Sequence, residues 1–175
     1  LSKIEAGQAT ITVEPVNIAT SMQSLIEPLR PLAQQKGLDL RCQIDADVPM
    51  RMQTDGLRLG QILKNLLTNA VKFTHQGSVT LHVSMEGPKM IAFAVRDTGI
   101  GIPESQLQMI FEAFHQADGS THRKYGGTGL GLSIARNLAK LLDGNISVHS
   151  VPDSGSVFTF RTTVDQALPE LIQKH

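Results

Sequence analysis

The sequence predicts a two-layer α/β sandwich, with helices covering a mixed, mostly antiparallel sheet. Short runs that alternate apolar and polar residues, as half-buried strands do, recur along the chain. Long segments with apolar residues at helical spacing separate these runs, and two adjacent runs form a hairpin pattern. The chain has 175 residues, of which 41% are hydrophobic. This length and composition suit one domain with a substantial core.

The first complete helix is predicted over residues 17–36. Asn17 suits the N-cap position because its side-chain oxygen can accept a hydrogen bond from the first turn, and Gly37 suits the stop. Pro28 and Pro31 interrupt the pattern. Since proline removes a helical hydrogen bond, we expect them to kink or split this helix.

Three further helices are predicted. The longest begins after Asp55, a candidate cap, and continues to about Phe73. A second is expected over residues 104–114, and a third leads out of a glycine-rich run to Leu142. Asp143 and Gly144 close that last helix. Residues 1–6 have helical spacing and stop at Gly7, which predicts the tail of a helix that begins upstream.

The strands are predicted from β-prone residues and period-two alternation. Gly87 and Pro88 mark the turn of the hairpin. The predicted strands are residues 10–13, 38–44, 79–83, 91–95, 145–151 and 156–164.

Composition excludes several classes of function. Sixteen basic residues balance sixteen acidic ones, and aromatic residues make up 4%, which disfavours a nucleic-acid binder. The single cysteine, Cys42, cannot form an internal disulfide, so we expect an intracellular protein. No apolar run reaches the ~18 residues of a membrane span. The histidines are scattered without a cysteine pair, which disfavours structural zinc.

A polar stripe interrupts the apolar surface of the helix predicted to end at Phe73. Gln61, Asn65, Asn69 and Lys72 follow one another in steps of four, four and three, which place them on one face. Such a stripe can simply face solvent. However, asparagine is a poor helix former, and the stripe has no acidic partner for its lysine. Amide oxygens suit Mg²⁺ and an ammonium suits phosphate, so a binding face is the alternative.

Two glycine-containing segments are the other candidates for a site. Asp97 ends a predicted strand and is followed by Gly99 and Gly101, which could hold an adenine or form an ordinary turn. The run from Gly126 to Leu132 opens a helix, where backbone N–H groups can approach phosphate, although a flexible loop is the alternative. Before it, His122, Arg123 and Lys124 form either a solvated charge run or a contact for a γ-phosphate.

Taken in order, these segments resemble the motifs of sensor histidine kinases. The asparagine box, first glycine box, phenylalanine box and second glycine box correspond to residues 65–73, 97–101, 111–114 and 127–132. Their order and approximate spacing also match. Residues 1–7 resemble the end of the second dimerisation helix, and residues 114–127 resemble the hybrid subclass, which carries receiver domains.

The resemblance implies a fold, cofactors and residue roles. The fold is the GHKL sandwich shared with gyrase-type, mismatch-repair-type and heat-shock-chaperone-type ATPases, and the cofactors are ATP and Mg²⁺. It implies that Asn69 coordinates the metal, that Asn65 and Lys72 are the catalytic residues at the phosphates, and that Asp97 binds adenine. Residues 115–128 are expected to form a mobile lid over ATP, anchored by Phe111 and Phe114. The implied nucleotide-binding residues are Asn69, Phe73, Asp97, Gly99, Gly101, Arg123, Lys124, Gly127, Thr128, Gly129, Leu130 and Gly131.

Two departures from related proteins bear on the reaction. None of the six histidines precedes Asp or Glu, so the phosphoaccepting histidine of the family is absent from this sequence. In related ATPases of this fold, a Glu one helical turn before the metal-binding Asn acts as general base. Asn65 stands at that position, and its amide cannot take a proton near neutral pH.

Two functions therefore remain open at this point. One is a working kinase domain, which passes the ATP γ-phosphate to a histidine on a separate domain for relay to a receiver aspartate. The other is a catalytically silent nucleotide-binding or docking module, although loss of Asn69, Asp97 or a glycine would then be expected. We expect residues 1–8 to end the dimerisation helix, residues 9–164 to bind ATP and residues 165–175 to be linker.

The expected partners follow from the same resemblance. They are the phosphoacceptor dimerisation domain of the parent kinase and a receiver domain or response regulator. We expect no nucleic acid and no direct membrane contact for this segment. The expected location is the cytoplasm, with a parent that could be anchored in the inner membrane.

Overall fold

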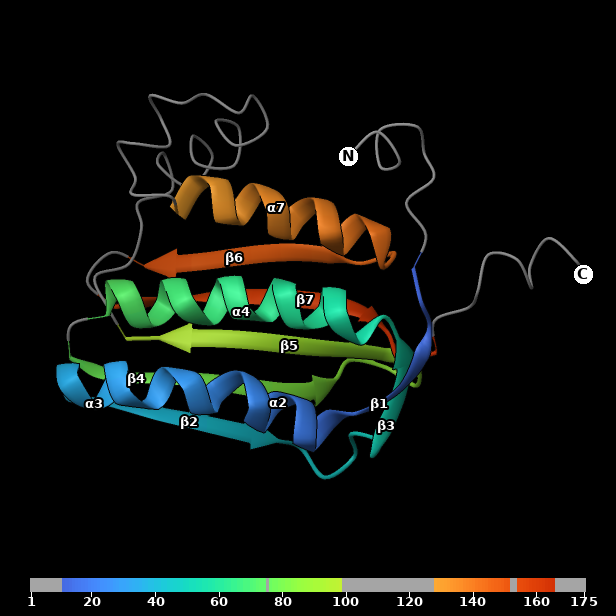
Figure 1. Ribbon diagram of the computed structural model, residues 1–175, viewed down its shortest axis with the longest axis horizontal. Helices are drawn as coiled ribbons and strands as arrows, with labels where there is room; N and C mark the ends of the chain where they lie inside the picture. Colours follow the sequence, from blue (N-terminus) through green and yellow to red (C-terminus); the bar gives the residue numbers. More distant parts are fainter. Residues whose placement is uncertain (1–10, 75, 99–127, 152–153, 166–175) are drawn as a thin grey trace, which may run out of the picture.

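The computed structural model describes residues 11–74, 76–98, 128–151 and 154–165. They form an α/β sandwich, in which four helices lie over one face of a sheet (Figure 1). The helices are α2 (Ile18–Ile26), α3 (Arg30–Lys36), α4 (Gly56–Phe73) and α7 (Thr128–Leu141). The predicted fold class is confirmed. The helix tail over residues 1–6, the helix over 104–114, the lid and the linker lie wholly or largely outside the described residues.

The main sheet has the strand order β2-β4-β5-β7-β6. Strands β2 and β4 are parallel and every other neighbouring pair is antiparallel, as predicted for a mixed, mostly antiparallel sheet. Its strands are β2 (Leu38–Ile44), β4 (Gly77–Met85), β5 (Met90–Asp97), β6 (Asn145–Val151) and β7 (Gly155–Thr163).

The strand predicted at residues 10–13 is wrong in position. Residues 11–13 form no regular structure, and the strand is β1 (Glu14–Asn17). It pairs antiparallel with β3 (Arg51–Thr54), which the sequence did not predict, in a separate two-stranded sheet. Pairing with a segment nearly forty residues away, rather than the local β propensity of residues 10–13, decides where β1 lies.

The helix predicted over residues 17–36 is split, as its prolines indicated. Asn17 caps α2 by accepting a hydrogen bond from the Thr20 N–H at 2.9 Å. A 3₁₀ turn, η1 (Glu27–Leu29), separates α2 from α3 and has Pro28 near its start. Gly37 ends α3 in the left-handed region, with φ 72°.

The N-terminus of α4 is fixed by the buried carboxylate of Asp55. Its oxygens accept hydrogen bonds from the backbone N–H of Arg58 at 3.1 Å and of Thr12 at 2.9 Å, and it pairs with the Arg58 guanidinium. Burial alone would raise the pKa of this carboxyl. The hydrogen bonds from Thr12 and Arg58 and the charge of Arg58 outweigh burial, so the pKa is lowered from its ordinary value.

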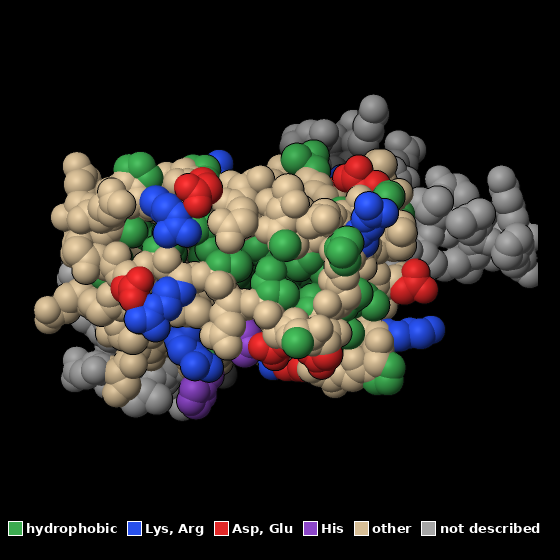
Figure 2. Space-filling model, turned by 90° about the horizontal axis from the view of Figure 1, so that it is seen from below, with side chains coloured by type: hydrophobic (Ala, Val, Ile, Leu, Met, Phe, Trp, Pro, Cys, Tyr) green, Lys and Arg blue, Asp and Glu red, His purple; other side chains and the backbone are tan. Residues whose placement is uncertain are grey.

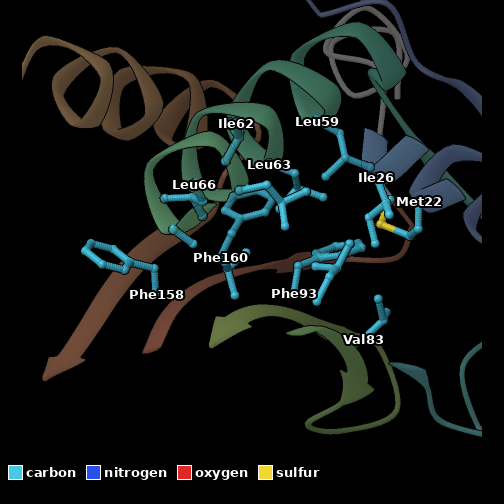
Figure 3. Packing of buried hydrophobic residues seen from close by; sticks show 14 of the residues in the cluster. Met22, Ile26, Leu59, Ile62, Leu63, Leu66, Val83, Phe93, Phe158 and Phe160 are labelled. Carbon is cyan, nitrogen blue, oxygen red and sulfur yellow. The ribbon is translucent and has the colours of Figure 1, made fainter. Parts of the chain in front are cut away.

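The core lies between α4 and the inner face of the sheet. Phe93 of β5 and Phe160 of β7 stack there, with ring centroids 6.1 Å apart. Ile62, Leu63 and Leu66 of α4 point toward these rings, and Met22 and Ile26 of α2 continue the cluster (Figure 3). The apolar face of α4 is thus turned to the sheet, which forces its polar face outward.

One face of the molecule carries charges of both signs. Seen from below, basic and acidic side chains alternate around an area where hydrophobic side chains remain visible (Figure 2). Met50 and Leu32 are among the exposed apolar residues, at 73% and 40%. Within the described part of the chain, no helix has both the length and the hydrophobicity to cross a bilayer.

Candidate nucleotide-binding site

The described candidate residues gather at one edge of the sandwich. The C-terminal end of α4, the end of β5 and the first turn of α7 all lie at the left of Figure 1. β7 begins at the same edge, because it runs antiparallel to β5 and pairs Ser156 with Asp97. Segments that are far apart in the sequence therefore end or begin on the same side of the sandwich.

The polar stripe lies on the outer face of α4. Asn65 and Asn69 are half-buried, whereas Gln61 and Lys72 are exposed. The polar surface is wider than the predicted narrow stripe, because Lys64 is also exposed and Thr68 is half-buried. Phe73 is the last residue of α4, and only its backbone is described.

Asp97 is buried at the end of β5. The hydroxyl of Ser156 donates a hydrogen bond to Asp97 Oδ2 at 2.9 Å, which fixes the orientation of the carboxylate. A carboxylate accepts several hydrogen bonds, so this contact does not exhaust it. Sequence reasoning missed Ser156, because 59 residues separate the two in the chain. The only signal was its position directly after a glycine at the start of a predicted strand.

Two glycines allow the neighbouring strands to pack closely against the end of β5. A Cβ on Gly155 would lie 2.0 Å from the backbone oxygen of Asp97, and Gly155 has φ +105°. On the other side, a Cβ on Gly77 would lie 2.0 Å from Thr98 Oγ1, and Gly77 has φ +108°. Thr98 Oγ1 also accepts a hydrogen bond from the Ser78 N–H at 3.0 Å. The strand end that carries Asp97 is thus held from both neighbouring strands.

The glycine-rich run enters α7 as predicted. The backbone of Thr128, Gly129, Leu130 and Gly131 forms the first turn of α7. The first N–H groups of a helix lack helical acceptors and carry the positive end of the helix dipole, which suits an anion. Gly99, Gly101, Arg123, Lys124 and Gly127 lie outside the described residues, so their predicted roles stay predictions.

The fold and a match to a family model together define the class of this protein. Residues 54–166 match the family described as histidine kinase-, DNA gyrase B-, and HSP90-like ATPase. The chain belongs to this family, and the predicted resemblance is confirmed.

The curated relatives are sensor kinases. The chain is 41% identical over 168 residues to the signal transduction histidine-protein kinase BarA of Escherichia coli (strain K12), covering 94% of this chain and 18% of BarA. It is 41% identical over 160 residues to the sensor histidine kinase RcsC of the same strain, covering 91% of this chain and 17% of RcsC. The chain thus spans less than a fifth of either relative.

Solved structures agree on the fold. ShkA, solved at full length in complex with AMPPNP, superposes with a TM-score of 0.77 and 33% identity, over 93% of this chain and 34% of ShkA. The catalytic domain of the histidine kinase ThkA superposes with a TM-score of 0.73 and 22% identity, over 89% of this chain and 97% of that domain. At that identity, the second likeness supports the fold alone.

Proposed function

We propose that this chain binds ATP with Mg²⁺ and donates the γ-phosphoryl group to a histidine on a separate dimerisation domain of its parent protein. A receiver domain or response regulator would then accept the group on an aspartate. The observation that supports this most is that the α4 end, the Asp97 carboxylate held by Ser156 and the α7 start lie on one side of the sandwich. These three segments belong to the asparagine box and the two glycine boxes, by which the sequence resembles sensor histidine kinases.

Asp97 is proposed to select the base. When ionised, its carboxylate only accepts hydrogen bonds, which fits the exocyclic amine of adenine. Guanine presents an oxygen at that position, so two acceptors would face each other. The buried position and the Ser156 hydroxyl favour a fixed carboxylate over one that turns to suit either base.

The outer face of α4 is proposed to meet the phosphates. Asn69 would hold Mg²⁺ through its amide oxygen, a hard ligand that this cation accepts. Bound there, Mg²⁺ would neutralise phosphate charge during transfer. Asn65 and Lys72 are proposed to contact phosphate or the water bound to its metal ion. The N-terminus of α7 is proposed to bind a phosphate oxygen.

The site is proposed to favour transfer over hydrolysis. A general base for water must be able to take a proton near neutral pH, and the amide of Asn65 cannot. Positioning and the cationic groups can still stabilise in-line transfer to a nucleophile that another domain delivers. The chain would therefore keep ATP intact until a histidine is presented.

We accordingly expect very slow ATP hydrolysis by this chain alone and no labelling of the chain by γ-labelled ATP. Phosphate release at saturating ATP measures the first, and autoradiography of the denatured chain the second. Asn65→Glu supplies a carboxylate at the position of the general base and is expected to raise hydrolysis. Brisk hydrolysis by the unaltered chain would contradict the argument from Asn65.

A further inference from the structure

The last turn of α4 is held by a lysine from another helix. The final carbonyls of a helix have no helical N–H partner. The Thr74 N–H donates to the Ala70 oxygen at 3.1 Å, which continues the helical pattern by one residue. The next two carbonyl oxygens, of Val71 and Lys72, both accept hydrogen bonds from Lys36 Nζ, at 2.7 and 2.8 Å.

Lys36 is itself firmly placed. It is the last residue of α3, and the Gly37 N–H donates back to the Gln34 oxygen at 3.1 Å. β2 then begins at Leu38, which pairs with Gly77 at the start of β4, the strand that follows α4. Lys36 therefore connects the end of α3 to the end of α4, and the strands that follow these two helices, β2 and β4, pair in the sheet.

Two features make this contact stronger than a hydrogen bond between neutral groups. Hydrogen bonds from an ammonium are roughly twice as strong as those between neutral groups. A cation is also favoured at the C-terminal end of a helix, where the dipole is negative. The contact fixes the last turn of α4, which carries Lys72 and follows Asn69. Asp55 fixes the opposite end of this 18-residue helix.

We propose that Lys36 is a positioning residue for the nucleotide phosphates. Its ammonium fixes the last turn of α4 through the Val71 and Lys72 carbonyls and so sets where Asn69 and Lys72 meet the phosphates. This inference rests on the proposed function, because it assigns the end of α4 to phosphate binding. The adenine side of the site, at Asp97, is held by the pairing of β5 with β4 and β7 and by the Ser156 hydroxyl, whereas the Lys36 ammonium donates to the end of α4.

The test compares Lys36→Met with two controls. Lys140→Met removes an exposed lysine from the last turn of another helix, α7, and Asp55→Asn weakens α4 at its other end. Lys36→Met is expected to weaken Mg²⁺·AMPPNP binding about tenfold, the scale of lost hydrogen bonds to a charged group. Binding of adenosine, measured by chemical-shift titration, is expected to stay unchanged. Lys36→Arg keeps the charge and donors and should recover most of the affinity.

Hydrogen exchange of the amides at residues 71–74, measured without nucleotide, provides an independent readout. These amides are expected to exchange faster in Lys36→Met than in either control. Equal weakening of adenosine and AMPPNP, or a lower melting temperature with unchanged AMPPNP affinity, would overturn the proposal. A wild-type chain that binds no AMPPNP would remove the proposed function itself, and the exchange rates would still show whether Lys36 fixes the helix end.

Discussion

Asp97→Asn is expected to weaken ATP binding by about 1–3 kcal/mol, the cost of losing a hydrogen bond to a charged group. This corresponds to roughly 5- to 150-fold in affinity. The physical reason is that the carboxylate accepts from the adenine amine, whereas an amide has lost the charge and offers a donor on one side. Because the Ser156 hydroxyl can also accept a hydrogen bond, the variant amide can turn its oxygen to adenine, and the expected loss is mainly that of the negative charge.

Isothermal titration with ATP and with GTP measures this effect. The unaltered chain should prefer ATP, and the preference should shrink in Asp97→Asn. Asp47→Asn is the matched control, because Asp47 is exposed in the turn before β3. The melting temperature of each variant separates lost binding from lost folding. Binding of GTP as tight as that of ATP by the unaltered chain would remove Asp97 from base recognition.

Asn69→Ala is expected to abolish most of the magnesium dependence of ATP binding. Altering even the groups that support a metal ligand costs about 10–100-fold in metal affinity, and loss of the ligand itself should cost at least as much. Asn69 is half-buried on the outer face of α4, so truncating it opens no cavity in the core. The loss should therefore appear in binding rather than in stability.

The measurement is the ratio of ATP affinities with Mg²⁺ and with a chelator. In the unaltered chain the ratio should be large, and in Asn69→Ala it should approach one. Asn137→Ala, which changes an exposed asparagine of α7, should keep the wild-type ratio. If Asn69→Ala keeps the same magnesium dependence, Asn69 is not the metal ligand.

Local signals in the sequence predicted most of the elements. Asn17 and Asp55 accept hydrogen bonds from N–H groups three residues on, so each cap is encoded within one turn. Alternation likewise predicted β2 and β4, in which alternate residues are turned to the core. Both kinds of signal are contained in a few consecutive residues and need no tertiary contact to be recognised.

Contacts between distant residues could not be predicted in the same way. The bond between Ser156 and Asp97 joins residues 59 apart, and that between Lys36 and Val71 joins residues 35 apart. Neither serine nor lysine is unusual in its own segment. Strand β3 was missed for the same reason, since four residues define it by pairing with β1 rather than by propensity.

The central claim is that this site donates a phosphoryl group to a histidine on another domain. The most direct measurement mixes the chain with the acceptor helices of its own parent and γ-labelled ATP. The expected result is label on the acceptor piece that is labile to acid and stable to base, as a phosphohistidine is. That label should depend on Asp97 and Asn69. No labelled acceptor, from a chain that demonstrably binds ATP, would contradict the claim and favour a nucleotide-binding regulatory module.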